Sequence, residues 1–283
     1  MRDGWFDENL ETFVKTMRDY KTMSPYCTDA MDISIGVMPN RPHKVLDLGC
    51  GAGALSIQAA SRLAPIGGSV TSIDSSRRML ELLELERSSM KLENLDTVLM
   101  DGEFLQFEHD TFTIVYSAFS LVFFSDREKI VKEMLRVLTP GGKCVITSFP
   151  YNNEVFNIFE EAIFRLTKIH PSETIRQVVS LGDGIDIKRM MRDCGFTNAT
   201  VHTTSHQWLM PIDVFLNFFR FNPIFKTFQS YLPECYQSNF VTMCREIIEE
   251  IFPDGTLDLK ITCVIGLGEK PKTNGQVALN PHS

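Results

Sequence analysis

Three aspartates and three glycines in the first half of the chain have side chains or backbones that could act together on one ligand. The glycines Gly49, Gly51 and Gly53 lie in the stretch VLDLGCGAGAL at 45–55, where their lack of a side chain lets the backbone approach a ligand closely. Asp47 comes two residues before Gly49, and a further aspartate ends each of the next two apolar runs. Carboxylates of this kind can accept hydrogen bonds from amino groups or from paired hydroxyl groups.

The glycine pattern alone fits two kinds of ligand. Gly49, Gly51 and Ala54 satisfy the G-x-G-x-x-G/A pattern of a dinucleotide site, in which a pyrophosphate rests on a helix N-terminus. Asp47 would repel that pyrophosphate, whereas it could hold a cationic amino group. Asp74 could bind the ribose of either ligand, and Asp101 could accept from an adenine amine. The carboxylates therefore favour an adenosine ligand with an amino group.

The elements that must position these side chains alternate between strand-like and helical patterns. Because strands that alternate with helices form a mostly parallel sheet covered on both faces, the chain is predicted to be α/β, with its ligand at the carboxyl ends of the strands. Asp126 is a plausible N-cap for the helix expected over 126–138. The alternating segments between 44 and 149 are KVLDLG, ALSIQAASRLA, SVTSID, RRMLELLELERSSMKL, DTVLMD, TFTIVYSAF, DREKIVKEMLRVL and KCVITSF.

Five motifs over residues 40–150 resemble those of the class I S-adenosylmethionine-dependent methyltransferases: V-L-D-L-G-C-G-A-G, I-D-S-S-R-R-M-L, M-D-G-E-F-L-Q-F, F-T-I-V-Y-S and L-R-V-L-T-P-G-G. The resemblance implies a Rossmann-like, doubly wound, mostly parallel seven-stranded sheet with an antiparallel last strand and helical cap insertions. It also implies S-adenosylmethionine as the cofactor, with the methionine amino group toward Asp47, the ribose on Asp74 and the adenine at Asp101. The cofactor-binding residues that it implies are Asp47, Gly49, Cys50, Gly51, Gly53, Asp74, Ser75, Met79, Asp101, Gly102, Glu103 and Ser117.

The chain departs from that family pattern on the acceptor side. Thr113 stands where many relatives have aspartate, and the sequence LVFF at 121–124 replaces the histidine or tryptophan motifs often found there. No N-P-P-Y or D-P-P-Y motif follows the fourth strand, which disfavours a nucleobase or amide nitrogen as the acceptor. No catalytic residue and no metal site is assigned.

The changing patterns divide the chain into expected segments. We expect a helical cap at 1–40, a cofactor-binding core at 41–208 with a helical excursion at 150–195, and a helical insertion at 209–256 that covers the acceptor site. A last core strand at 257–270 and a disordered tail at 271–283 would complete the chain.

The insertion contains FLNFFRFNPIFKTF, whose phenylalanines allow three interpretations. They could pack a helical cap, line an apolar acceptor pocket, or form a membrane-surface helix. The last is disfavoured because only Arg220 and Lys226 supply positive charge. The phenylalanines are Phe215, Phe218, Phe219, Phe221, Phe225 and Phe228.

Other side chains that could do chemistry have plain alternative roles. His202 and His206 share a strand face but lack a third metal ligand, so structural roles are favoured. Tyr20 and Tyr26 could either cover the cofactor or simply pack.

Composition excludes several classes of protein. A net charge of −8 over 283 residues works against a nucleic-acid partner, because such binding rests on lysine and arginine. The seven cysteines form no C-x-x-C pair, no secretory or transit signal is recognisable, and no apolar run is long enough to span a membrane. We therefore expect a cytoplasmic protein without stable membrane insertion.

The leading functional hypothesis is methyl transfer from S-adenosylmethionine to a small, partly apolar acceptor. The acceptor atom would be an oxygen of a carboxylate, phenol or enol, or an activated carbon. Val122 and Phe123, in place of the usual acceptor-side residues, leave open a regulatory or assembly protein that binds the cofactor without catalysis. A nicotinamide dehydrogenase is a third hypothesis.

Overall fold

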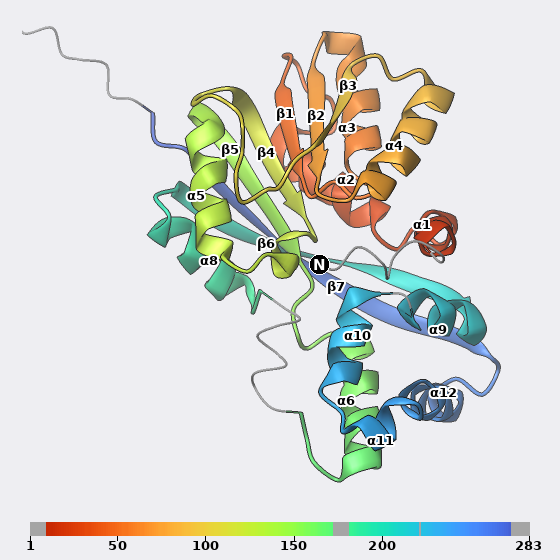
Figure 1. Cartoon of the computed structure of the whole chain (residues 1–283). Coiled ribbons are helices and arrows are strands. Elements are labelled where there is room, and N and C mark those ends of the chain that lie inside the picture. Colours follow the sequence, from red (N-terminus) through yellow and green to blue (C-terminus); the bar gives the residue numbers. More distant parts are fainter. Residues whose placement is uncertain (1–9, 172–180, 221, 273–283) are drawn as a thin grey trace, which may run out of the picture.

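The computed structural model describes residues 10–171, 181–220 and 222–272 and contains one seven-stranded sheet (Figure 1). Its strand order is β3-β2-β1-β4-β5-β7-β6. Six strands run parallel, and β7 runs antiparallel to both of its neighbours, β5 and β6. The strands are β1 Lys44–Leu48, β2 Ser69–Asp74, β3 Leu95–Leu99, β4 Phe112–Ala118, β5 Leu138–Ser148, β6 Thr197–Pro211 and β7 Thr256–Glu269. The predicted doubly wound sheet with an antiparallel last strand is confirmed.

Helices cover both faces of this sheet (Figure 1). They are α1 Leu10–Asp19, α2 Ser24–Ile35, α3 Ser56–Leu63, α4 Arg77–Met90, α5 Arg127–Val137, α6 Glu154–Thr167, α8 Gly184–Asp193, α9 Ile212–Arg220, α10 Pro223–Ser230, α11 Glu234–Gln237 and α12 Phe240–Ile251, with short 3-10 turns η1 Ala64–Ile66 and η2 Leu121–Phe123. The buried apolar side chains form two clusters. The larger one joins α1, α2, α3, α6, α9 and α12 to the sheet, and the smaller one lies under α5 and α8.

Helix α5 illustrates how local sequence sets these elements. The Asp126 side chain caps the helix by accepting a hydrogen bond from the Lys129 backbone N–H at 2.9 Å. Ile130 and Met134, four residues apart, are fully buried against the sheet. The predicted helix over 126–138 therefore forms, within one residue at each end.

Helices α6, α9, α10 and α12 gather at one end of the molecule, beside the long hairpin of β6 and β7 (Figure 1). The Arg165 guanidinium of α6 donates two hydrogen bonds, of 2.7 and 2.8 Å, to the Glu250 carboxylate of α12. Phe159 of α6 packs edge-on against Phe219 and Phe225 of the neighbouring helices. The segment 209–256 thus holds the end of β6 followed by four helices.

Helix α1 connects this helical group to the core of the sheet. The Phe13 ring stacks on Phe218 of α9 with their centroids 4.9 Å apart. On its other side, the Arg18 guanidinium pairs with the Glu86 carboxylate of α4 at 2.9 Å.

Within the described ranges, no helix has both the length and the apolar character needed to cross a membrane. The tail expected at 271–283 lies almost wholly outside the described residues.

Candidate active site

A cavity of about 1290 Å³ opens at the carboxyl ends of the central strands. Its walls come from the glycine turn after β1, the ends of β2 to β5, the inner face of α1, and the segments around α9 and α10. This is the edge where a doubly wound sheet ordinarily binds its ligand. All the predicted site residues except Ser117 line it.

The glycine turn brings backbone to the cavity at a place where side chains would not fit. The backbone N–H groups of Gly49 and Cys50 both donate to the Ile73 carbonyl oxygen of β2 at 2.9 Å, which holds the turn against the neighbouring strand. Gly49 has a φ of +69°, and a Cβ there would lie 2.5 Å from the Ser120 Cβ. Gly53 has a φ of +89°, and its Cβ would meet Leu83. Glycine is therefore required at both positions.

Asp47 is a buried carboxylate with one unpaired oxygen in the wall of the cavity. Its Oδ2 accepts a hydrogen bond from the Ser56 hydroxyl at 2.5 Å, whereas Oδ1 is buried and has no partner among the described residues. Burial, with a further contribution from the charge of Asp74, raises the pKa of Asp47 to about 7. A cationic amino group beside Oδ1 would satisfy this oxygen and favour the ionised carboxylate.

The Asp74 carboxylate accepts hydrogen bonds that hold the glycine turn, and it can still accept further hydrogen bonds from a ligand. Its Oδ2 accepts from the Gly51 backbone N–H and its Oδ1 from the Ser76 backbone N–H, both at 2.8 Å. Each oxygen keeps a second lone pair, so paired hydroxyl groups of a ribose can still donate to it. Burial raises the pKa of Asp74, while these backbone donors oppose the shift.

Asp101 lies at the exposed rim of the cavity. Its Oδ1 accepts from the Glu103 backbone N–H at 2.9 Å. Gly102 is packed so closely that a Cβ would lie 2.9 Å from the Phe124 ring. Leu99 and Phe123 add apolar surface at the same rim. The rim thus offers a carboxylate acceptor beside flat apolar surface, which suits a purine.

Ser117 is the one predicted site residue that the structure keeps away from the cavity. It is fully buried, and its hydroxyl lies 2.7 Å from that of Ser120. Ser120 lines the cavity in its place and donates to the Leu48 carbonyl oxygen at 2.7 Å. Because the chain turns into η2 directly after β4, the side chain three residues later reaches the cavity.

The far end of the cavity is aromatic and carries no charge. It is bounded by Phe119, Phe149, Phe156, Trp208 and Phe219. The rings of Phe119 and Phe149 stack with centroids 4.5 Å apart. Among the described residues, the lining side chains from β5, α6, β6, α9, α10 and β7 include none that ionises. This end suits an apolar ring.

Helix α1 contributes lining residues that the sequence patterns did not single out. Phe13, Met17 and Arg18 face the cavity, and the Arg18 guanidinium also lies 3.4 Å from the Ala52 carbonyl oxygen of the glycine turn. The helical spacing of Phe13 and Met17 would have indicated an amphipathic helix, but not what it covers.

The phenylalanines of the insertion divide between two of the expected roles. Phe215, Phe218, Phe225 and Phe228 are buried in the core, and Phe219 is both buried and part of the cavity wall. Most of these rings therefore pack in the core, and one also forms part of the cavity wall. Phe221 lies outside the described residues. Because the four core rings are buried, none of them is available to a membrane surface.

The other candidate side chains lie outside the cavity. His206 pairs with Asp29 of α2 at 2.7 Å, and His202 is exposed. Tyr26 is buried and donates to the Ile261 carbonyl oxygen at 2.8 Å, while Tyr20 packs partly buried against the core. In the described part of the chain, no group of three or more histidine, cysteine, aspartate or glutamate side chains could hold a metal ion.

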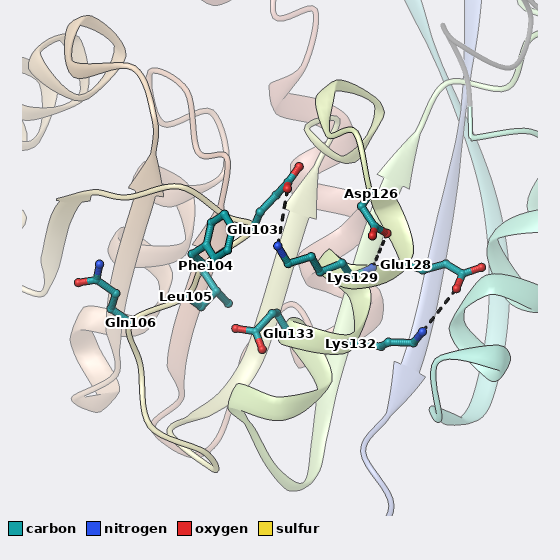
Figure 2. Close-up of a pocket in the computed structure, with 9 residues that line it drawn as sticks. All are labelled: Glu103, Phe104, Leu105, Gln106, Asp126, Glu128, Lys129, Lys132 and Glu133. Carbon is teal, nitrogen blue, oxygen red and sulfur yellow. Dashed lines mark hydrogen bonds and ion pairs between the residues drawn. The ribbon is translucent and has the colours of Figure 1, made fainter.

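A second hollow, of about 710 Å³, lies on the surface between the loop after β3 and α5 (Figure 2). Figure 2 shows Lys129 pointing toward Glu103 and Lys132 toward Glu128, at 3.8 and 3.5 Å. The Lys129 ammonium also lies 3.7 Å from the centre of the Phe104 ring. These charges are already paired, so the hollow is a solvated surface feature beside the cavity rather than its centre.

Comparisons with known proteins identify methyltransferases as similar proteins. Residues 45–142 match the model of a methyltransferase domain. The demethylmenaquinone methyltransferase of Staphylococcus aureus is 33% identical over 173 residues, which cover 56% of this chain and 70% of that protein.

Solved structures share the fold. A Bacillus halodurans protein described as a methyltransferase superposes with a TM-score of 0.56 at 18% identity, over 87% of this chain and 99% of that one. Phosphoethanolamine N-methyltransferase 2 of Haemonchus contortus, solved with S-adenosylmethionine, superposes with a TM-score of 0.57 at 19% identity, over 95% of this chain and 60% of that one. The identity to the Staphylococcus aureus enzyme goes beyond fold: the chain belongs to the class I S-adenosylmethionine-dependent methyltransferases, and it uses S-adenosylmethionine to methylate a small molecule.

Proposed function

We propose that the cofactor lies with its methionine part at Asp47, its ribose at Asp74 and its adenine at Asp101. The unpaired Oδ1 of Asp47 supports the first contact, since an ammonium group would satisfy it. The free lone pairs of Asp74 support the second, and the flat apolar rim beside Asp101 supports the third. The other predicted residues on these walls are Gly49, Cys50, Gly51, Gly53, Ser75, Met79, Gly102 and Glu103.

The acceptor, in this proposal, is a small uncharged molecule with an aromatic body. The observation that carries it is the aromatic, charge-free end of the cavity, which continues from the glycine turn. A carboxylate acceptor would have to bury its charge there without a cation to pair with, which is costly. A flat ring can instead stack against Phe149 and Trp208, as aromatic pairs do elsewhere in proteins.

The acceptor atom in this proposal is an electron-rich ring carbon, as in a hydroquinone or an enol. The described residues at that end offer no side chain to deprotonate the acceptor, and burial keeps the nearby Cys27 protonated because it raises the pKa of its thiol well above the usual value. The cofactor supplies an already activated methyl group. The ring carbon would form its bond to that methyl group as the carbon–sulfur bond of the cofactor breaks. The ring proton would leave afterwards, to water that enters once the transfer is complete.

The protein's contribution would be orientation and exclusion of water. Held in line at short range, the two reactants gain the large advantage of proximity without needing acid–base groups. The aromatic walls keep water from the reacting atoms. The Staphylococcus aureus relative, named for a quinone acceptor, supports a ring of this type.

A label-transfer assay tests the acceptor class. Cofactor with a tritiated methyl group is incubated with the protein and either a 1,4-naphthohydroquinone that carries an apolar substituent or an aromatic carboxylic acid of similar size. We expect label in the hydroquinone that resists alkaline hydrolysis, as a methyl group on carbon does. Label released by alkali from the carboxylic acid, as from an ester, would overturn the proposal.

Two phenylalanine variants in the same insertion provide a matched control. Phe219 lines the cavity, whereas Phe225 is equally buried but does not. Phe219→Leu should lower kcat/KM for the ring acceptor about tenfold, while Phe225→Leu should lower stability alone. Equal kinetic losses in both variants would mean that the aromatic wall does not recognise the acceptor.

A further inference from the structure

The corner between α9 and α10 places one amide side chain in the otherwise apolar end of the cavity. Asn222 lines the cavity and is 8% exposed. Its backbone N–H donates to the Phe219 carbonyl oxygen at 2.9 Å, and its own carbonyl oxygen accepts from the Lys226 N–H at 3.2 Å. The backbone of this corner is therefore fixed from both sides.

The side-chain amide of Asn222 is oriented by a helix cap. Its Oδ1 accepts from the Ile224 backbone N–H at 2.8 Å, at the N-terminus of α10. Because only the carbonyl oxygen of the amide can make this bond, the amino group must occupy the other position. No hydrogen bond joins its Nδ2 to any residue in the described ranges. Nδ2 is not one of the fully buried unpartnered atoms among the described residues, so its N–H groups stay open at the cavity wall and can donate to a ligand oxygen.

At this end of the cavity, the Asn222 amino group and the Trp208 indole N–H are two donors without a hydrogen-bond partner among the described residues. Trp208, Phe219 and Ile224 line the same end and offer the amino group no oxygen from their side chains. The Ser148 hydroxyl also lines the cavity and could donate to a ligand, but it is directed to the Phe149 carbonyl oxygen, at 3.4 Å.

We propose that the Asn222 amide donates a hydrogen bond to an oxygen of the acceptor and so selects which ring atom faces the cofactor. This inference rests on the proposed aromatic acceptor and narrows it to rings that carry a carbonyl, enol or phenol oxygen. The amide is neutral, so the oxygen it binds need not be charged. Asn222 acts as a positioning and specificity-determining residue.

The test uses a substitution that keeps the cap but removes the donor. Aspartate caps helices as well as asparagine does, so Asn222→Asp retains the bond from the Ile224 N–H while it replaces the amino group by a second oxygen. Asp126→Asn, at the cap of α5 and outside the cavity, is the matched control for the exchange of amide and carboxylate. The probes are 1-tetralone, which has one carbonyl oxygen, and tetralin, which has none.

Binding of the probes is measured by equilibrium dialysis with S-adenosylhomocysteine at saturation. We expect the wild type and Asp126→Asn to bind 1-tetralone about tenfold more tightly than tetralin. Asn222→Asp should lose this preference while its affinities for tetralin and for S-adenosylhomocysteine stay unchanged. A merely structural role would weaken both probes alike.

The outcomes separate this inference from the proposed function. If Asn222→Asp still prefers 1-tetralone, or if both probes weaken together, the inference is wrong although methyl transfer to an aromatic ring can still be observed. If the wild type binds neither probe and labels no aromatic ring, both the proposed function and this inference fail.

Discussion

At the residue scale, Asp47 is a buried carboxylate, and burial disfavours its ionised form. Its carboxylate is 1% exposed, and burial together with the charge of Asp74 raises its pKa to about 7. Since the folded-state pKa lies above the ordinary value of an aspartate, Asp47 favours the fold of the free protein at low pH, and this contribution is lost as the pH rises through about 7. Ionisation of Asp47 therefore lowers the stability of the free protein, and an ammonium group bound beside the carboxylate would reduce this loss.

The first prediction follows from that titration. An ammonium group binds the ionised form of Asp47, so affinity for S-adenosylhomocysteine should fall as the pH drops below about 7, by up to about tenfold per pH unit. Asp47→Asn should bind more weakly at pH 8 and vary less between pH 5.5 and 7.5. Calorimetric titration across this range, with Asp126→Asn as the control, measures both effects. A pH dependence that survives in Asp47→Asn would assign the titration to another group, such as Asp74.

The second prediction concerns the glycine turn. Gly49→Ala adds a Cβ that would lie 2.5 Å from the Ser120 Cβ, in a side chain fixed by its bond to the Leu48 carbonyl oxygen. Gly67 has a similar φ, +73°, but its Cβ would meet nothing within 4 Å. Gly67→Ala should therefore cost about 1 kcal/mol from backbone strain alone, and Gly49→Ala at least about 2 kcal/mol. Equal costs in urea denaturation would show that the contact with Ser120 relaxes freely.

At the element scale, α1 is joined to both the insertion and the core. It carries the Phe13 ring that stacks on Phe218, and its Arg18 pairs with Glu86 on α4. Glu11 pairs with Arg78 beside it. The two ion pairs are partly exposed and so contribute little to the free energy of unfolding, whereas the buried ring pair contributes more. The attachment of α1 therefore depends mainly on the aromatic stack.

A double-mutant cycle measures this attachment as the third prediction. Phe13→Ala and Phe218→Ala should each lower the free energy of unfolding by about 3 kcal/mol or more. The double variant should lose about 0.5 to 1.5 kcal/mol less than the sum of the two, because the stacking is lost only once. Strict additivity in urea denaturation would mean that the rings do not interact.

Elements near the glycine turn could be predicted from the sequence because their signals are local. The strand ends at Asp47 and Asp74, the cap at Asp126 and the antiparallel last strand follow from hydrophobic patterns, capping chemistry and family motifs. Ser117 was predicted at the cavity, but the turn after β4 gives that place to Ser120. The role of the insertion phenylalanines depends on which helices pack together, and no local pattern encodes that.

The contribution of Asn222 was hidden for a related reason. Its sequence context, an asparagine before a proline, indicates only a helix start. That its amino group meets the apolar end of the cavity depends on how α9 and α10 dock beside β6. The role of such a residue follows only from the packing of the whole helical group.

At the scale of the whole molecule, the cavity joins parts of the chain that are far apart in sequence. Its walls include α1, the strand ends of the sheet and the corner after α9. The larger apolar cluster runs through the same elements, and the sheet shares its other face with the smaller cluster under α5 and α8. Ligand binding should therefore stabilise both clusters together, since neither can unfold without disrupting the sheet between them.

The fourth prediction tests this linkage by thermal unfolding. S-adenosylhomocysteine at about a hundred times its dissociation constant should add about 2.7 kcal/mol to the free energy of unfolding. For a chain of this size, that raises Tm by about 5 °C in a single transition. NAD at the same concentration should leave Tm unchanged, because its pyrophosphate would lie against Asp47. If the transition splits and only part of it moves, the two clusters unfold independently, and a larger shift with NAD would contradict the reading of Asp47 as an ammonium site.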